Sequence, residues 1–502
     1  MPTRNVPSCA FLLGAALTIF AAPPARGQDV RDHWDRFRGP NGSGVVEGHA
    51  LPKACDATTL VFEVEVPLGH SSPVVRDGRL YLTGIEAAVS KAAAAGEGAE
   101  GSKATARDAL TTLCLDAKTG KTLWQRSVPR ERREAYDERN NAAAPTPCCD
   151  ENGVVAFFPD FGLIAYDLEG REAWRRELGP FRNVYGMGAS PILDATTVYL
   201  VCDQQQDSFV LALDRKSGKE RWRRARPLAL SGHCTPIFVA DAEHRRLIVP
   251  GSFLLDAYDI ASGERAWFVS GLACEMKSTP VVSGTTIFIN GYASPLNQPG
   301  NQVEVPSFEV ALEDFDKDKD GHISKQEAPK NRAMSYFDFV DRDGKGALDA
   351  DEWELLRAAL ASQNGMLAIR AGGSGDRSKE NVVWAYRRQV PQLPSPLLYQ
   401  GLLYMLGDQS GLVTILDPQD GNVVLRGRLR DGQDNYYASP VAGDGKVYFV
   451  GESGLVSIVR AGKELESLGV FDLGERCYAT PAIDEGRLFV RSTKRLRCYG
   501  GA

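Results

Sequence analysis

The sequence predicts an all-β fold: an eight-bladed β-propeller with four-stranded blades and a small α-helical insertion in the fifth blade. A Ser/Thr-Pro pair followed by a short apolar strand recurs eight times, and the pairs lie 41 to 45 residues apart wherever nothing is inserted. A strand-rich repeat of this length is typical of one propeller blade. The eight pairs are Ser72-Pro73, Thr146-Pro147, Ser190-Pro191, Thr235-Pro236, Thr279-Pro280, Ser395-Pro396, Ser439-Pro440 and Thr480-Pro481.

Each repeat has the same interior, which the first one shows. Two short β-rich runs, residues 72–75 and 78–84, precede residues 111–128, which we interpret as two strands joined by an Asp-x-x-Thr-Gly turn. Gly120 supplies the positive φ that such a tight turn needs. A tryptophan follows in the fourth strand of five repeats, and we expect it to pack between blades. These residues are Trp124, Trp174, Trp222, Trp267 and Trp384.

Two repeats are longer than the others, and both carry their extra residues between the second and third strands. The first repeat contains about residues 86–108, which are rich in Ala, Gly and Ser and predict a mobile loop. The fifth contains about residues 293–365, which carry recognisable chemistry.

The two ends of the chain predict how the propeller closes. The eighth repeat stops after three strands, whereas Thr59–Val66 is a strand that precedes the first repeat. This segment can supply the missing outer strand of the eighth blade and so cover an exposed sheet edge.

The insertion contains a calcium-binding loop. Residues 316–327 match the pattern D-x-[DN]-x-[DN]-G-x₅-E at every position. Calcium prefers about six to eight oxygen ligands, which alternating carboxylates on a tight loop provide, and Gly321 allows the sharp turn. The expected ligands are Asp316, Asp318, Asp320, the backbone carbonyl of His322, and Glu327.

A second loop follows at residues 341–352. Lys345 stands at a ligand position and cannot coordinate, so weaker binding or a structural role is expected. The expected ligands are Asp341, Asp343, the backbone at Ala347, and Glu352. Ile323 and Leu348 should join the two loops, and apolar residues at helical spacing predict flanking helices at 308–315 and 352–361.

The loops before the Ser/Thr-Pro strands should gather at one end of the central channel. They offer a polar, mixed-charge lining, although each residue can equally be a hydrogen-bonded loop residue without a binding role. The candidates are His70, Asn183, Tyr185, His233, Glu275, Lys277, Asn435, Tyr437, Arg476 and Tyr478. The sequence contains no GxSxG, HExxH or phosphate-loop motif, so we assign no catalytic residue.

Composition and the N-terminus indicate an exported protein. The net charge of −7 argues against nucleic-acid binding. Residues 9–22 are an apolar run too short for a comfortable membrane span, and residues 25–27 form a small-x-small cleavage site. We expect a signal peptide over 1–27 and a periplasmic or secreted product; a membrane anchor is the alternative. No later stretch approaches membrane length, so the mature chain should lack a transmembrane segment.

The predicted organisation is then simple. The propeller occupies residues 28–292 and 365–502, and the calcium-loop pair occupies residues 293–364. Of the ten cysteines, nine remain after cleavage, an odd number that forbids complete pairing within the chain.

The repeat at Leu115–Trp124 resembles the tryptophan-docking repeat of quinoprotein (PQQ) dehydrogenases, and it is also similar to that of BamB-type outer-membrane assembly propellers. Residues 37–42 (FRGPNG) resemble the start of exported bacterial PQQ-like repeat proteins. The dehydrogenase resemblance implies a calcium-bound quinone over the channel, a catalytic aspartate and usually an adjacent cysteine pair. Cys148-Cys149 is such a pair, but it lies within a strand, where neighbours point to opposite faces, so we do not expect a ring disulfide.

The sequence therefore favours a calcium-binding, non-enzymatic propeller that acts as a scaffold in the cell envelope. Its expected partner is an unidentified envelope protein or polymer, and we expect a monomer. A PQQ-dependent dehydrogenase is the alternative, and a glycan-binding module is a weaker one.

Overall fold

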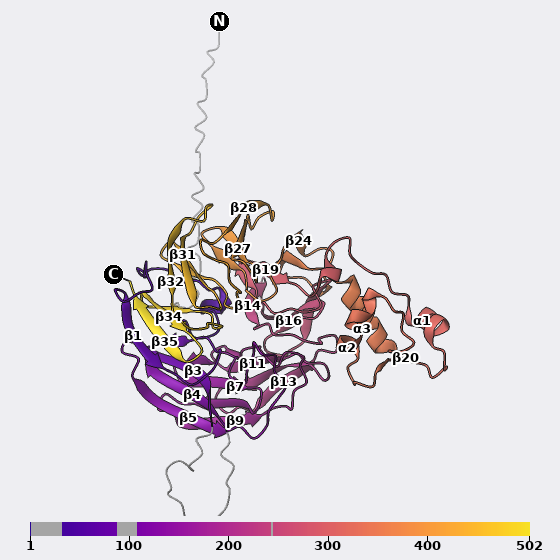
Figure 1. The fold of residues 1–502 in the computed structure, drawn as a ribbon, viewed down its shortest axis with the longest axis horizontal. Coiled ribbons are helices and arrows are strands. Elements are labelled where there is room, and N and C mark those ends of the chain that lie inside the picture. The colour runs from indigo at the N-terminus through magenta and orange to yellow at the C-terminus, as the bar shows by residue number, and fades with distance from the viewer. Residues whose placement is uncertain (2–32, 88–107, 242–243, 502) are drawn as a thin grey trace, which may run out of the picture. The chain divides into compact units, whose positions relative to one another are not determined.

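The computed structural model describes Met1 and residues 33–87, 108–241 and 244–501, of which residues from 33 onward belong to one compact unit (Figure 1). The predicted signal peptide and most of the predicted loop at 86–108 lie outside the described residues. No helix in the described ranges is long and apolar enough to cross a membrane.

The unit is an eight-bladed β-propeller, as predicted, and each blade is an antiparallel sheet built around four strands. Blades 1 to 4 comprise β2 (Val74–Arg76), β3 (Arg79–Glu86), β4 (Ala109–Asp116) and β5 (Thr122–Pro129); β6 (Cys148–Asp150), β7 (Gly153–Phe158), β8 (Gly162–Tyr166) and β9 (Glu172–Glu177); β10 (Ile192–Leu193), β11 (Thr197–Cys202), β12 (Phe209–Asp214) and β13 (Glu220–Ala225); β14 (Ile237–Asp241), β15 (His244–Gly251), β16 (Leu254–Asp259) and β17 (Arg265–Ser270). Blades 5 to 8 comprise β18 (Val281–Ser283), β19 (Thr286–Gly291), β22 (Gly365–Arg370) and β24 (Val382–Tyr386); β25 (Leu397–Tyr399), β26 (Leu402–Leu406), β27 (Leu412–Leu416) and β28 (Val423–Arg428); β29 (Val441–Gly443), β30 (Lys446–Val450), β31 (Leu455–Arg460) and β32 (Ser467–Asp472); β33 (Ala482–Asp484), β34 (Arg487–Arg491), β35 (Arg495–Gly500) and β1 (Leu60–Glu65). A short β23 (Gly375–Asp376) adds a parallel fifth strand to blade 4.

The predicted closure is confirmed. Strand β1 pairs antiparallel with β35 and completes the eighth blade, so the two ends of the propeller are joined (Figure 1). Phe62 on β1 takes the place of the docking tryptophan, since a Cβ on Gly120 of blade 1 would lie 2.6 Å from its ring.

The Ser/Thr-Pro motif joins neighbouring blades. In six of the eight pairs of neighbours, the backbone N–H of the Ser or Thr donates to the hydroxyl of its counterpart in the next blade, at 2.9–3.1 Å. These hydroxyls form a ring of hydrogen bonds around the channel. The repeat thus supplies a connection that strands within one blade cannot make.

The predicted packing of tryptophans between blades is also visible. The indole N–H of Trp124 donates to the carbonyl of Leu168 in the next blade at 2.9 Å, and a Cβ on Gly170 would lie only 2.7 Å from that indole. Trp174, Trp222 and Trp384 make equivalent bonds. Trp267 differs, because it donates to Asp241 within its own blade.

The segment before β1 contacts the inner strands of several blades. Its guanidinium groups hydrogen-bond to backbone carbonyls on different sides of the channel: Arg36 to Pro236 at 2.6 Å, and Arg38 to Pro396 at 2.8 Å. The segment includes a short 3-10 helix, η1 (Pro40–Gly42), and Phe37 lines the cavity described below. The FRGPNG motif is therefore an internal plug of the channel.

The insertion lies between β19 and β22 and contains the only α-helices in the described residues. Its elements are η3 (Pro295–Asn297), α1 (Phe308–Phe315), β20 (Ile323–Ser324), η4 (Arg332–Tyr336), α2 (Phe337–Val340), β21 (Ala347–Leu348) and α3 (Ala350–Ala361). Strands β20 and β21 pair through Ile323 and Leu348, as predicted.

Candidate functional site

The first EF-hand loop, between α1 and β20, gathers three of its four predicted acidic ligands, and Glu327 lies outside that cluster. Carboxylate oxygens of Asp316, Asp318 and Asp320 lie within 4.8 Å of one another. The Glu327 carboxylate accepts hydrogen bonds from the Lys317 N–H at 2.9 Å and from the Ser324 hydroxyl at 2.6 Å, and the Ser324 bonds lower its pKa to about 2. This donor set fits calcium, a hard cation that binds oxygen.

The second loop, between α2 and β21, brings Asp341, Asp343 and Glu352 within the same 4.8 Å. It is more deeply buried than the first, and burial raises the pKa of Glu352. The Lys345 ammonium lies 2.6 Å from the Asp343 carboxylate, so a cation of the chain already competes for a ligand. The backbones of His322 and Ala347 stand at the matching position of each loop, next to and within the β20–β21 pairing.

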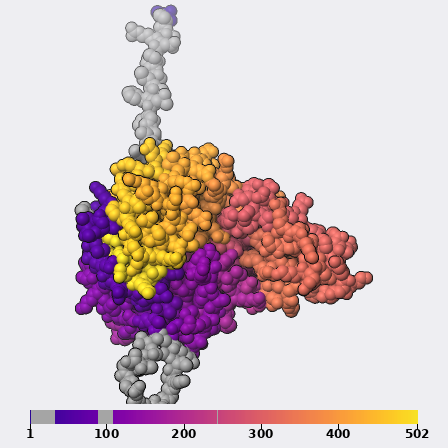
Figure 2. Space-filling model, viewed as in Figure 1, coloured from indigo at the N-terminus to yellow at the C-terminus, as the bar shows by residue number. Residues whose placement is uncertain are grey.

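The paired loops do not hang free of the propeller. Side chains of blade 4 and its neighbouring loops share one apolar core with the insertion. From the propeller this core takes Leu230, Phe253, Leu254 and Cys274; from the insertion it includes Trp353, Phe337, Leu356 and Ile323. Figure 2 shows the insertion, in orange-red, packed against the body of the propeller.

The linker that leads into α1 covers a further part of the apolar surface. The Trp353 indole N–H donates to the carbonyl of Pro306 at 2.9 Å, and the Arg357 guanidinium donates to that of Val305 at 3.3 Å. Val303 and Val305 pack on the same core. The apolar face of the helix pair is thus filled by residues of this chain.

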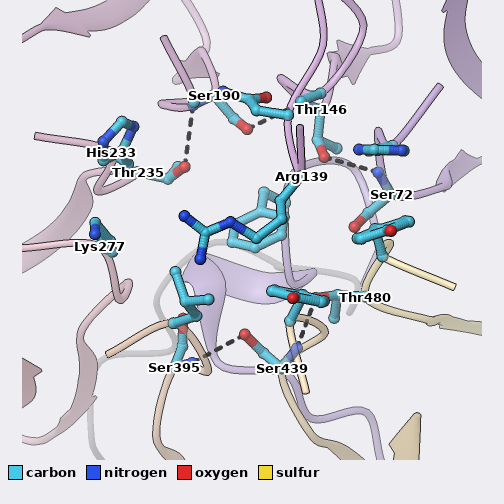
Figure 3. Close-up of a pocket in the computed structure, with 18 of the residues that line it drawn as sticks. Ser72, Arg139, Thr146, Ser190, His233, Thr235, Lys277, Ser395, Ser439 and Thr480 are labelled. Atoms are coloured by element: carbon cyan, nitrogen blue, oxygen red, sulfur yellow. Dashed lines mark hydrogen bonds between the residues drawn. The ribbon is translucent and has the colours of Figure 1, made fainter. Parts of the chain in front are cut away.

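The axial pocket is a cavity of about 220 Å³ at one end of the channel (Figure 3). The ring of Ser and Thr hydroxyls, Phe37 from the plug, and five aromatic side chains on the loops line it. Those aromatic residues are His70, Tyr185, His233, Tyr437 and Tyr478.

The structure brings only some of the predicted mouth residues to this cavity. Lys277 lines the cavity, and its ammonium pairs with the carboxylate of Glu275, which lies outside the lining. Asn435 and Arg476 lie outside the lining, where both face Glu452: the Asn435 amide donates to it at 2.9 Å, and the Arg476 guanidinium lies 3.9 Å away. Asn183 lies outside it too.

Sequence reasoning missed Asp137, Arg139 and Asn140. They come from the long connection between blades 1 and 2, which carries no repeat signal. Arg139 extends across the cavity in Figure 3 and forms a bidentate pair with Asp137, at 2.5 and 3.0 Å. Asn140 donates to the backbone carbonyl of Tyr185 at 2.9 Å and so fixes the neighbouring wall.

Every charged side chain that lines the pocket has an opposite charge in contact. Lys277 lies 2.7 Å from Glu275 and over the Tyr185 ring, 4.2 Å from its centroid. Burial lowers the pKa of His70 to about 4 and that of His233 to about 3, so both are neutral at physiological pH. The pocket therefore presents no uncompensated charge.

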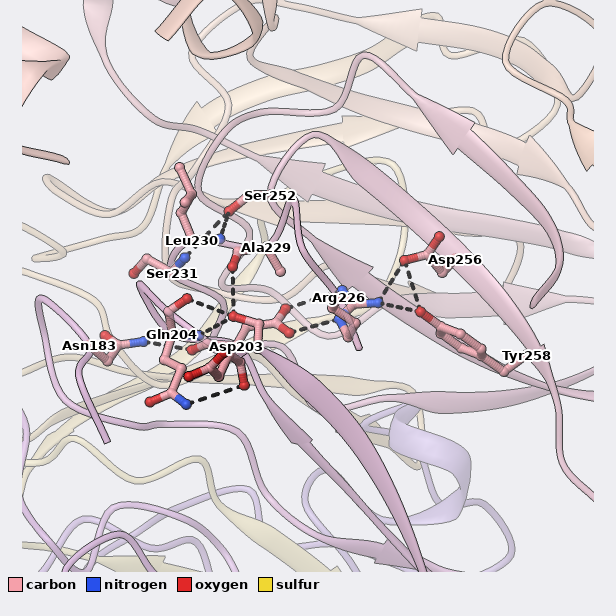
Figure 4. Close-up of polar contacts among 12 residues, drawn as sticks. Asn183, Asp203, Gln204, Arg226, Ala229, Leu230, Ser231, Ser252, Asp256 and Tyr258 are labelled. Atoms are coloured by element: carbon pink, nitrogen blue, oxygen red, sulfur yellow. Dashed lines mark hydrogen bonds and ion pairs between the residues drawn. The ribbon is translucent and has the colours of Figure 1, made fainter. Parts of the chain in front are cut away.

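A buried polar network supports the loop that carries Tyr185 (Figure 4). Arg226 pairs with Asp203 at 2.7 Å and with Asp256 at 2.6 Å, and all three are almost fully buried. The side chain of Asn183 donates to the backbone carbonyl of Asp203 at 2.9 Å. The network ties this loop to the end of β11 in blade 3 and to β16 in blade 4.

The cysteine pair does not reach the pocket. Cys148 and Cys149 lie on β6, fully buried and unpaired, and their side chains join different core clusters on the two faces of the strand. All nine cysteines in the described ranges are free. Among the same residues, the only acidic clusters close enough to hold a metal are the two loops of the insertion.

Comparison with known proteins identifies the family. A model described as outer membrane protein assembly factor BamB matches residues 83–224 and 359–499, more than half of the chain. The chain belongs to the BamB family. A model described as EF hand matches residues 309–327 and 334–356, which confirms the two loops as an EF-hand pair. None of the curated proteins matches the sequence.

Solved structures with the same fold include a BamB and dehydrogenases. BamB from Moraxella catarrhalis is 11% identical with a TM-score of 0.52, covering 88% of this chain and 97% of that one. A europium-containing methanol dehydrogenase is 10% identical with a TM-score of 0.54, and the match covers 91% of this chain and 89% of that one. Quinohemoprotein alcohol dehydrogenase from Comamonas testosteroni is 11% identical with a TM-score of 0.53, and the match covers 94% of this chain and 81% of that one. At such identities the likeness shows the fold alone.

Proposed function

We propose that this BamB-family propeller is a non-enzymatic binding scaffold of the cell envelope, in which calcium holds the EF-hand pair on the propeller. The observation that carries the proposal is that the apolar face of the pair is already filled. Phe253 and Cys274 enter it from the propeller, and Val305 covers it from the linker.

The filled face favours a structural role for calcium over a signalling one. Calcium sensors open on binding and expose an apolar groove to a target, whereas EF-hands of the buffering type barely open. Opening here would expose Trp353 and Leu356, which are fully buried. The first loop would form the tighter calcium site, with Asp316, Asp318, Asp320, Glu327 and the His322 carbonyl as ligands. The second loop would form a weaker site.

The residues at the pocket do not fit the alternative, a PQQ-dependent dehydrogenase. A calcium-bound quinone needs carboxylates free to hold its metal, but Asp137 is engaged by Arg139 and Glu275 by Lys277. The carboxylates of the quinone would also enter a site with no uncompensated positive charge, which is costly.

Two measurements test the proposal. Calorimetric titration should show calcium binding that Glu327→Gln weakens, and calcium should raise the resistance of residues 293–365 to proteolysis. The protein incubated with PQQ and calcium should reduce no dye when alcohols or sugars are supplied. Quinone-dependent dye reduction would overturn the non-enzymatic role, and unchanged calcium binding in the variant would overturn the metal assignment.

Export to the envelope and an envelope protein or polymer as partner remain parts of this proposal. Membership of the BamB family and the N-terminal sequence pattern support them. Determining the N-terminus of the mature protein tests export, since cleavage is expected near residue 27.

A further inference from the structure

The axial pocket has more hydrogen-bond donors than acceptors left to offer. Each ring hydroxyl that accepts an N–H from the neighbouring blade keeps its own O–H, and no acceptor within the described residues engages it. Thr146, Ser190 and Ser439 are examples that line the cavity.

The two cations at the pocket also keep free donors. Arg139 uses Nε and Nη2 for Asp137, and among the described residues Nη1 has no hydrogen-bond partner. The ammonium of Lys277 carries three N–H groups but donates only to Glu275. Both side chains lie at the cavity, so an occupant would meet these groups directly.

The carboxylates at the pocket, by contrast, are already engaged by donors of this chain. The Glu275 carboxylate accepts from the Tyr185 hydroxyl at 3.3 Å, from Lys277 at 2.7 Å and from the Gln392 amide at 3.2 Å. Asp137 is held by both ends of the Arg139 fork. A fitting occupant must therefore bring several acceptor oxygens.

The same contacts argue against a charged occupant. Among the side chains that line the pocket, an anion would meet only cations that are already paired with a carboxylate, so the loss of its hydration would be costly. The neutral histidines add no charge either. Oxygen acceptors on an uncharged molecule satisfy both conditions.

The walls of the pocket are flat and aromatic. The rings of His70 and Tyr478 stack with centroids 4.2 Å apart, and the ring centroids of Tyr437 and Tyr478 are 5.2 Å apart. The Tyr185 ring also lines the pocket, with the Lys277 ammonium 4.2 Å from its centroid. The volume of about 220 Å³ is below the roughly 300–1,000 Å³ of sites for drug-sized ligands, so a single ring fits it.

We propose that the axial pocket binds one neutral sugar ring, whose hydroxyl oxygens accept from Lys277, Arg139 and the Ser/Thr ring while its C–H faces pack on the tyrosines. The inference rests on the proposed function, because it treats the pocket as a binding site and not as a quinone site. The ring can be a free monosaccharide or the end of a glycan chain.

The test measures binding by calorimetry with millimolar D-glucose, D-galactose and D-mannose, and with D-glucuronate as the charged counterpart. At least one neutral hexose should bind, and D-glucuronate should bind at least about tenfold more weakly, a difference of about 1.4 kcal/mol. Comparing the bound hexose with a trisaccharide that ends in it distinguishes the source: tighter binding of the trisaccharide indicates a glycan end, and equal binding a free sugar.

The decisive variant is the double substitution Glu275→Gln with Lys277→Met, which removes the free donors of Lys277 without leaving a charge unpaired. It should weaken hexose binding at least about tenfold. Asp444→Asn with Lys446→Met is the matched control, because Lys446 is equally buried and paired but lies on blade 7 outside the pocket. The control should bind like the wild type.

Three results would overturn the inference: no binding by any of the three hexoses, binding of D-glucuronate as tight as theirs, or unchanged binding in the Glu275/Lys277 variant. Binding is measured without quinone. Quinone-dependent dye reduction would therefore refute the proposed scaffold role separately, whatever the sugars do.

Discussion

Phe253 provides a sharp test of how the insertion is attached. It lies in the turn between β15 and β16 with a φ of 67°, a left-handed conformation that is rare for a bulky residue and costs about 1–3 kcal/mol. Two backbone hydrogen bonds, with Ala273 and Leu272, hold it there. The residue is 6% exposed, and it belongs to the core of the insertion. Burial of the ring therefore offsets the strain.

Two substitutions at this position separate packing from strain. Phe253→Ala removes the ring, which should cost about 3–5 kcal/mol of unfolding free energy, and it keeps a Cβ in the left-handed conformation. Phe253→Gly loses the same packing but relieves the strain, so it should be about 1 kcal/mol more stable than the alanine variant. This order reverses the usual advantage of alanine over glycine.

Urea unfolding in saturating calcium measures both effects, and proteolysis of residues 293–365 locates them. An alanine variant that loses less than about 1 kcal/mol would show that the insertion does not depend on blade 4. An alanine variant at least as stable as the glycine variant would refute the strain.

Three further outcomes are expected. Glu327→Gln should weaken the tighter calcium site and Glu352→Gln the weaker one, because each removes a carboxylate that closes its loop; calorimetric titration of the two variants against wild type should give unequal losses. Deleting residues 59–66 should cause aggregation or a large drop in melting temperature, because the edge of β35 is exposed; a soluble and equally stable product in size-exclusion chromatography would contradict the closure. Arg226→Met should cost about 3–5 kcal/mol in thermal unfolding, because the buried Asp203 carboxylate loses its cation (Figure 4), and a loss below about 1 kcal/mol would contradict this role.

The propeller was predictable because its signal is repeated. The Ser/Thr-Pro pairs, the Gly turns and the docking tryptophans recur in register, so each blade supports the interpretation of the others. The function of the pairs was not predictable in the same way. The hydrogen bond from Thr146 to Ser190 joins residues that are 44 apart, and only the curvature of the ring brings them together.

The calcium loops were predictable for a different reason. All ligands of one loop lie within twelve consecutive residues, so sequence order is almost spatial order. The docking of the insertion has no such local signal. Phe253 and Leu254 look like ordinary turn and strand residues, and only the structure shows that they enter the core of the EF-hand pair.

The pocket illustrates the limit of the repeat signal. His70, Tyr185, His233 and Lys277 precede Ser/Thr-Pro strands and were found by that position. Arg139 precedes such a strand by a longer stretch of irregular chain, and no repeat marks it. Residues in irregular connections are placed by tertiary contacts that sequence spacing does not encode.

The EF-hand pair and the pocket share their supporting loops. On one loop, Arg182 donates to the carbonyl of Arg342 in the second calcium loop at 2.9 Å, while Tyr185, three residues on, lines the pocket. On a second loop, the Cys274 thiol lies 3.6 Å from the Tyr336 hydroxyl of the insertion. Cys274 directly precedes Glu275, which pairs with Lys277 at the pocket. We therefore expect an ion that orders the insertion to act on two walls of the pocket. By thermodynamic linkage any such effect is reciprocal, so a ligand that favours the same loop positions must also favour calcium.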